Sequence, residues 1–214
     1  MKLIFASAND HKVEEINETL RGVKNLEVVS MKDIGCLDDI PETSGTIQGN
    51  SLQKAQYLFE KYHVDCFSDD SGLEIDDLNG EPGVDTAHYS GSRDADKNIA
   101  FVLEKMGKTE RRTARFRTII TLILRGQIHV FAGVCEGTIR LEKSLGNQGF
   151  GYDPIFQPEG YNLTFAELLP EVKSQISHRG RAMKLLLDFL KTVSNDLGEL
   201  RNAEFIPQEK RKVL

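Results

Sequence analysis

The feature that most constrains the fold is a pair of β-rich runs in the middle of the chain, RFRTIITLIL (115–124) and QIHVFAGVC (127–135). A turn at Gly126 separates them. Two such runs joined by a short glycine turn predict an antiparallel β-hairpin. Any fold for this chain must therefore contain a sheet that includes these two strands.

Strand-like and helix-like segments alternate before this hairpin, and a helix follows it. Residues at helical spacing bury one face of each predicted helix, and short apolar runs predict the strands. This order predicts an α/β protein with a mixed β-sheet and flanking helices. The predicted strands are 2–6, 26–31, 66–68 and 73–75, and the predicted helices are 11–20, a segment capped by Asn50 with Gln53 in a capping box, 95–106 and 179–193.

Bulk properties narrow the class of protein. The chain of 214 residues is long enough for one sizeable domain, predicted over 1–197, with a polar tail over 198–214. A net charge of -6 argues against nucleic-acid binding but permits a phosphorylated small molecule in a locally basic pocket. Three scattered cysteines indicate a reducing compartment. With neither a signal peptide nor a membrane span predicted, we expect a cytoplasmic protein without a membrane partner.

The first turn joins a predicted strand to a helix N-terminus, where free backbone N–H groups and the helix dipole favour anions. Lys12 is a cation in the first helical turn, and a bound anion would remove the penalty of placing it there. The alternative is a solvated surface lysine. The P-loop signature is absent from the sequence. The turn consists of Ser7, Ala8, Asn9, Asp10, His11 and Lys12.

The same pattern occurs at the last predicted helix, which begins at Ser177-His178-Arg179 and carries Arg181 just beyond. Cations at a helix N-terminus oppose the helix dipole, so a second anion site would explain them. The simpler alternative is that Ser177 caps the helix.

Adjacent carboxylates stand in the sequence Asp69-Asp70-Ser71-Gly72. Magnesium prefers one or two carboxylates together with waters and substrate phosphates, so one of these groups could hold a metal or orient water while the other orders the turn. An ordinary acidic turn at a strand end is the alternative. Glu42 is either a second metal ligand or a solvated loop charge.

Glycines alternate with aromatic residues in GFGYDPIF (149–156). Glycine lets a ligand approach the backbone closely, and aromatic faces stack on nucleobases. Asp153 can accept hydrogen bonds from the edge of a base. The alternative is a β-turn whose aromatic side chains fill the core.

Together and in this order, these segments resemble the inosine triphosphate pyrophosphatase family, also called dITP/XTP pyrophosphatases. The resemblance covers the chain up to about residue 193. It is carried by GFGYDPIFQPEGYNLTFAELLPEVKSQISHRGRA (149–182) and by SDDSGLEIDDLNGEPGVDTAHYSG (68–91). It implies a long mixed sheet in two lobes around a central cleft, a homodimer, and Mg²⁺-dependent hydrolysis of ITP, dITP and XTP to the monophosphate and pyrophosphate, which cleanses the nucleotide pool.

The resemblance also implies a role for each matching residue. Asp70 would activate water and bind Mg²⁺ with Glu42, while residues 7–12 would hold the phosphates and Ser71 would contact substrate. Lys54 would face the phosphates. The base and the remaining phosphate contacts would come from Phe150, Gly151, Tyr152, Asp153, Lys173, His178 and Arg179.

Three positions depart from the family pattern. Ala8 replaces Gly or Asn, Gly49 stands where the family has an acidic residue, and His88 replaces an arginine. These changes leave open a shifted base preference, for example for a modified pyrimidine. A third hypothesis is a catalytically inactive nucleotide sensor, against which the intact Asp70, Lys12 and Arg179 argue.

Overall fold

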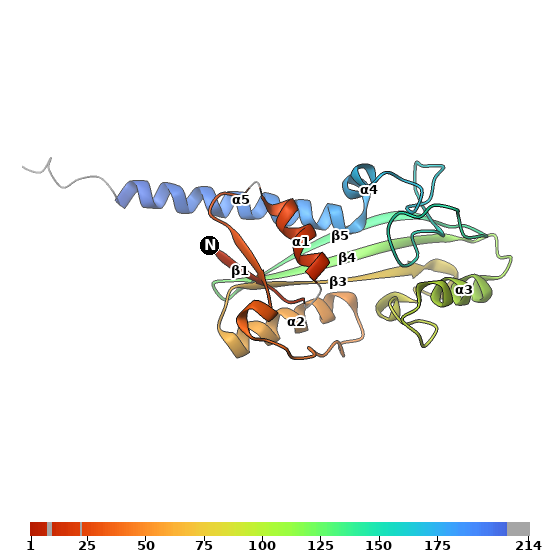
Figure 1. Ribbon diagram of the computed structural model, residues 1–214, viewed down its shortest axis with the longest axis horizontal. Coiled ribbons are helices and arrows are strands. Elements are labelled where there is room, and N and C mark those ends of the chain that lie inside the picture. The colour runs from red at the N-terminus through yellow and green to blue at the C-terminus, as the bar shows by residue number, and fades with distance from the viewer. Residues whose placement is uncertain (8–9, 22, 205–214) are drawn as a thin grey trace, which may run out of the picture.

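The computed structural model describes residues 1–7, 10–21 and 23–204. Within these residues the chain forms a six-stranded sheet in the order β2-β1-β3-β4-β5-β6, with helices packed against it (Figure 1). The strands are β1 (Lys2–Phe5), β2 (Glu27–Ser30), β3 (Cys66–Ile75), β4 (Thr113–Leu124), β5 (Gln127–Ile139) and β6 (Phe156–Pro158). The helices are α1 (Asp10–Leu20), α2 (Ile47–Tyr62), α3 (Ala95–Met106), α4 (Pro170–Ile176) and α5 (His178–Glu204), with short 3-10 turns at Lys32–Ile34, Asp76–Leu78 and Gly83–Asp85.

The sheet is mixed, as predicted. Strand β1 pairs in parallel with β2 and β3, whereas the pairs β3–β4, β4–β5 and β5–β6 are antiparallel. Arg125 and Gly126 join β4 to β5 with φ values of 52° and 77°. Two consecutive positive φ values match the right-handed twist of the flanking strands, so the predicted hairpin is confirmed. The division into two lobes stays a prediction.

Helices cover the two faces of the sheet differently. Helices α1 and α5 pack on one face, where Phe5, Phe67 and Leu186 lie in one apolar cluster. Helix α2 packs on the opposite face through Leu58, which shares a second cluster with Cys66. Because neighbouring residues of a strand point to opposite faces, Cys66 and Phe67 belong to different cores. A third cluster joins α3 to the segment between β6 and α4.

Strand β1 is much shorter than its neighbour β3, and this positions the candidate site. The pairing of β1 with β3 ends at Phe5 and Phe67, beyond which Ala6 N donates to Phe67 O at 2.8 Å. Further along the same edge of β3, the loop after the strand contacts it, where Leu73 N donates to Thr86 Oγ1 at 2.8 Å. The stretch between these two contacts carries the paired carboxylates.

Two local predictions were wrong. The Asp69–Gly72 stretch is not a turn, because every residue of β3 pairs with β4 and the strand continues through it. Helix α2 begins before Asn50, with Thr46 as its N-cap: the Thr46 side chain accepts from Gly49 N at 3.0 Å. Asn50 lies inside the helix, and its side chain accepts from Ser44 N at 3.1 Å.

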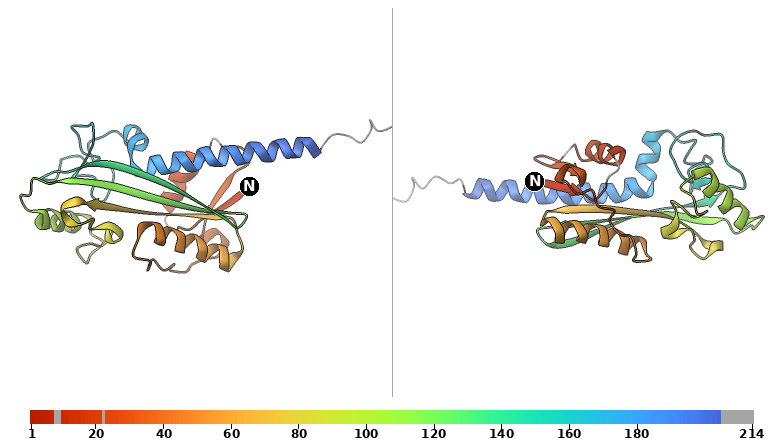
Figure 2. Two further views of the ribbon diagram at one scale, coloured as in Figure 1. Left: turned by 180° about the vertical axis from the view of Figure 1, so that it is seen from behind. Right: turned by 60° about the horizontal axis from the view of Figure 1, so that its bottom comes forward.

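The C-terminal helix also differs from the prediction. Helix α5 continues to Glu204 instead of ending near residue 193, and it extends beyond the sheet in both views of Figure 2. The tail predicted from residue 198 therefore begins inside this helix, and residues 205–214 lie outside the described part. The short helix α4 was not predicted. No helix in the described ranges combines the length and apolarity that crossing a membrane requires.

Candidate active site

A cavity of about 810 Å³ lies along the open edge of β3, between α2, the loop after β3, the segment before β6, and the helices α4 and α5. Its volume falls in the usual range for small-molecule sites, ~300–1,000 Å³. Most of the site residues predicted from the sequence line it, although they come from distant segments. These are Lys12, Glu42, Lys54, Asp70, Ser71, Phe150, Gly151, Tyr152, Asp153, Lys173, His178 and Arg179.

The predicted phosphate turn is placed only in part. Ser7 follows β1, is partly buried and does not line the cavity. Ala8 and Asn9 lie outside the described residues. Asp10 and His11 belong to the first turn of α1, and their side chains lie outside the described part of the structure.

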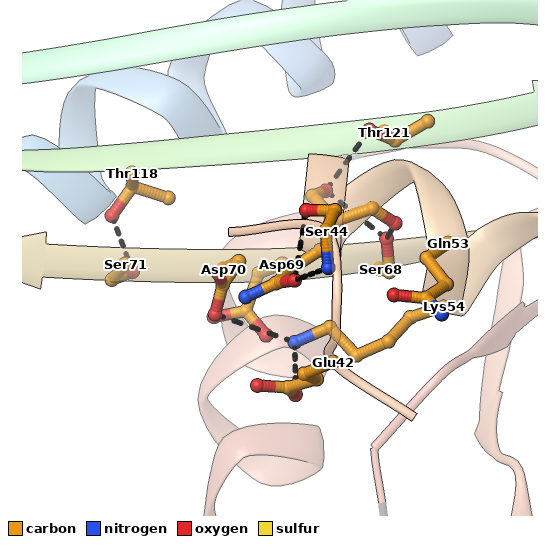
Figure 3. Close-up of polar contacts among 12 residues, drawn as sticks. Glu42, Ser44, Gln53, Lys54, Ser68, Asp69, Asp70, Ser71, Thr118 and Thr121 are labelled. Atoms are coloured by element: carbon orange, nitrogen blue, oxygen red, sulfur yellow. Dashed lines mark hydrogen bonds and ion pairs between the residues drawn. The ribbon is translucent and has the colours of Figure 1, made fainter. Parts of the chain in front are cut away.

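On the α2 face of β3, Lys54 reaches between two carboxylates (Figure 3). Its Nζ lies 2.7 Å from Glu42 Oε1 and 3.5 Å from Asp70 Oδ1. Burial raises the pKa of Asp70 to about 6, and the negative charges of Glu42 and Asp69 add to this rise. Burial alone would lower the pKa of Lys54, but the charges of Asp70, Asp69 and Glu42 outweigh it and raise that pKa. Lys54 is therefore a firmly charged ammonium group.

On the opposite face, Asp69 meets two cations. Lys12 Nζ lies 3.0 Å from Asp69 Oδ2, and Arg179 Nε lies 3.8 Å from the same oxygen. Burial would raise the pKa of Asp69, but the charges of Lys12 and Arg179 outweigh it and lower that pKa to about 2. Asp69 is therefore ionised at neutral pH.

Glu42 and Asp70 could hold a divalent cation. Both carboxylates contact the ammonium group of Lys54, so the place between them already holds a positive charge. The described residues contain no group of three or more acidic, histidine or cysteine side chains suited to a metal. Mg²⁺ commonly takes only one or two carboxylates and completes its shell with water and phosphate oxygens, so this pair fits it.

The cavity also carries an exposed aromatic ring. Phe150 is 66% exposed, and the Lys173 ammonium and the Arg179 guanidinium lie 5.3 Å and 5.5 Å from its ring centre. Buried Asp153 accepts from Phe150 N at 2.7 Å and from Lys173 Nζ at 2.5 Å. Tyr152, in contrast, is 2% exposed and belongs to the core around α3. Of the two sequence interpretations, ligand contact suits Phe150 and core filling suits Tyr152.

His178 and Ser177 start helix α5. Ser177 Oγ accepts from Gly180 N at 3.1 Å, so the capping role of Ser177 is confirmed. The His178 ring stacks on Phe116 with centroids 4.6 Å apart. Burial, with the nearby Arg179 and Lys173 charges, lowers the pKa of His178 well below its usual value. The imidazole at the cavity wall is therefore neutral.

Sequence reasoning missed several residues of the cavity wall. Arg93 and Asn98 line it, as does Thr86 from the loop after β3. His88, which the sequence singled out only as a departure from the family pattern, lines it too. Asn98 Oδ1 accepts from Ser90 N at 2.8 Å, which ties that loop to α3. The sequence offered one indication of Asn98: it is a polar residue among the buried positions of a predicted amphipathic helix.

This arrangement defines a class of protein: an α/β protein whose cavity suits an anionic ligand that carries a flat ring. Cations, carboxylates and an exposed aromatic ring line the same cavity. A nucleotide has both of these features.

The chain belongs to the Ham1 family, whose model matches residues 3–189. It is 47% identical over 192 residues to a dITP/XTP pyrophosphatase of Flavobacterium psychrophilum, covering 89% of this chain and 100% of that protein. It is 48% identical to a dITP/XTP pyrophosphatase of Porphyromonas gingivalis, with 88% and 97% covered. These matches confirm the family resemblance stated from the sequence.

Solved structures share the fold. The Ham1 protein of Staphylococcus aureus superimposes with a TM-score of 0.84 at 34% identity, covering 90% of this chain and 99% of that one. A nucleoside-triphosphatase, dITP/XTP pyrophosphatase, of Mycobacterium abscessus gives a TM-score of 0.75 at 40% identity, with 89% and 100% covered. The α/β fold predicted from the sequence is therefore confirmed.

Proposed function

We propose that this protein hydrolyses deaminated purine nucleoside triphosphates, namely ITP, dITP and XTP, to the monophosphate and pyrophosphate, and so cleanses the nucleotide pool. The observation that carries the proposal is one cavity with a cationic group of side chains and a carboxylate pair on opposite sides of β3. Relatives that share nearly half of the sequence over almost their whole length are named for this activity.

The phosphates are assigned to Lys12 and Arg179, together with the first turn, residues 7–12. Glu42 and Asp70 are assigned as ligands of Mg²⁺, which when bound neutralises charge that develops on the phosphate oxygens. Asp70, ionised, accepts a hydrogen bond from the attacking water and orients it toward the α-phosphorus. Lys54 stabilises the added negative charge from the α2 side.

The base is assigned to the part of the cavity around Phe150. Phe150 offers an exposed face for stacking, and Asp153 and Lys173 offer an acceptor and a donor for the edge of the base. A donor placed for a 6-oxo group is left unpaired when the base carries a 6-amino group, and such mismatches disfavour adenine strongly. Ser71, Gly151 and His178 complete the proposed substrate contacts, and Tyr152 supports this segment from the core.

The proposal includes a homodimer in the cytoplasm with neither a nucleic-acid nor a membrane partner. The homodimer rests on the family resemblance. The net charge of -6 supports the expectation about nucleic acid, because binding to a polyanion needs a basic surface.

The test measures pyrophosphate release from ITP, XTP, dITP, GTP and ATP, with Mg²⁺ and with a chelator in its place. We expect Mg²⁺-dependent release from the deaminated purines at least about tenfold faster than from GTP or ATP. Release from another nucleotide alone would indicate a changed base preference. Tight ITP binding without any release would indicate a nucleotide sensor, and either result would overturn the proposal.

A further inference from the structure

Asp69 is a buried carboxylate that has no place in the proposed reaction. It neighbours Asp70 but points to the opposite face of the sheet, and it does not line the main cavity. It borders a small apolar hollow behind the cavity with Phe5, Phe67 and Met183. A charged group in such surroundings is costly unless opposite charges compensate it.

Its compensating charges come from the two ends of the chain. Lys12 stands in the first turn of α1 and Arg179 in the first turn of α5, and both also line the cavity. Each cation lies at the positive end of a helix dipole, and the two repel each other. Asp69 lies within ion-pair distance of both, at 3.0 Å and 3.8 Å, and so brings them to one point.

The contact to Arg179 balances charge without forming a hydrogen bond. At 3.8 Å the distance is too long for one, and among the described residues Arg179 Nε is buried with no hydrogen-bond partner. The guanidinium therefore keeps hydrogen-bonding capacity for another anion. A phosphate group in the cavity would bind to Lys12 and Arg179, whose side chains Asp69 already holds close together and whose positive charge it partly neutralises.

We infer that Asp69 is a positioning residue for the phosphates. As an internal counter-ion it keeps the Lys12 and Arg179 side chains close together when no substrate is bound, and it lowers the affinity of these two cations for pyrophosphate. The inference rests on the proposed function, in which pyrophosphate is a product that must leave. Because Asp69 sits on a paired strand, it stays in place when phosphates arrive and competes with them for the same two cations.

The test is calorimetric titration of the full-length protein with magnesium pyrophosphate. In Asp69→Asn we expect pyrophosphate to bind on the order of tenfold more tightly, because one negative charge near the anion is removed. The same variant should gain more thermal stability from pyrophosphate than the wild type gains. A purely structural role for Asp69 would change the amount of folded protein but would not tighten binding.

Two further variants keep the test decisive. Asp69→Glu retains the charge, so its affinity for pyrophosphate should stay within about threefold of the wild type. Asp76→Asn makes the same charge change beside Arg115, outside the cavity, and should leave the affinity unchanged. Equal or weaker binding by folded Asp69→Asn, or a tenfold change in Asp69→Glu, would overturn the inference. Failure of the proposed function appears separately, as no pyrophosphate release by the wild type.

Discussion

The two sides of β3 carry opposite charge balances although they are built around neighbouring residues. On the α2 side, Glu42 and Asp70 contribute two negative charges against one positive charge on Lys54, which leaves one negative charge. On the α1 and α5 side, the ion pairs that the structure describes join two cations, Lys12 and Arg179, to the carboxylate of Asp69, and these three groups together carry one positive charge. One strand thus separates a place suited to a metal cation from a place suited to phosphate.

This difference divides the roles of two chemically identical side chains. The pKa of Asp69 is lowered to about 2 because cations outweigh its burial, whereas the pKa of Asp70 is raised to about 6 because burial and neighbouring carboxylates outweigh Lys54. Environment alone sets the pKa values of the two carboxyl groups apart.

The largest effect should follow from Asp70→Asn. Removing the group proposed to orient water and bind Mg²⁺ should lower kcat for XTP by about 10²–10⁴-fold. Pyrophosphate release under saturating substrate measures this, with Asp76→Asn as the matched control. If Asp70→Asn kept activity within about tenfold of the wild type, the division of roles would be wrong.

Glu42→Gln should have the next largest effect, on the metal requirement. We expect the Mg²⁺ concentration for half-maximal activity to rise by about 10–100-fold, because one of two carboxylate ligands is lost. Activity should recover when Mg²⁺ is raised. A loss of activity that no Mg²⁺ concentration reverses would show that Glu42 acts otherwise than as a metal ligand.

Asp153→Asn tests whether specificity resides beside Phe150, apart from the two faces of β3. The substitution removes the charged partner of Lys173. We expect the ratio of kcat/KM for XTP over ATP to fall about tenfold with a smaller change in kcat. Asp96→Asn, a surface carboxylate paired with Lys143, is the control and should leave the ratio unchanged.

The smallest effects concern stability, and they should have opposite signs. The raised pKa of Asp70 means that its ionised form destabilises the fold as pH rises from 3.8 to about 6, so Asp70→Asn should be more stable at pH 7. The lowered pKa of Asp69 contributes stability above 3.8 that is lost as pH falls toward about 2, so Asp69→Asn should be less stable.

Each change should amount to about 1–3 kcal/mol, or a few degrees in Tm. Thermal unfolding of metal-free protein at pH 7 measures both variants, and repetition at pH 4 should reduce the gain of Asp70→Asn. Shifts of the same sign in the two variants would show that the two carboxylates share one environment.

Much of the fold followed from local patterns. The hairpin at Gly126 and the helix at Ala95–Met106 were predicted because turn residues and apolar periodicity act within a few residues. The start of α2 was not, because Thr46 and Asn50 are both good caps. They are distinguished by their contacts, since Thr46 accepts from Gly49 N and Asn50 accepts from Ser44 N. The length of α5 exceeded its apolar pattern, so the pattern alone could not locate its end.

The sequence by itself predicted many of the residues that line the cavity, because the motifs that carry the family resemblance contain most of these predicted residues. Only the tertiary structure decided how they are arranged. The Asp69–Gly72 stretch has the composition of a turn, but pairing with β4 holds it in a strand and sends the two carboxylates to opposite faces. Which cation meets which carboxylate depends on helices that start far away along the chain, and short-range patterns carry no information about such distances.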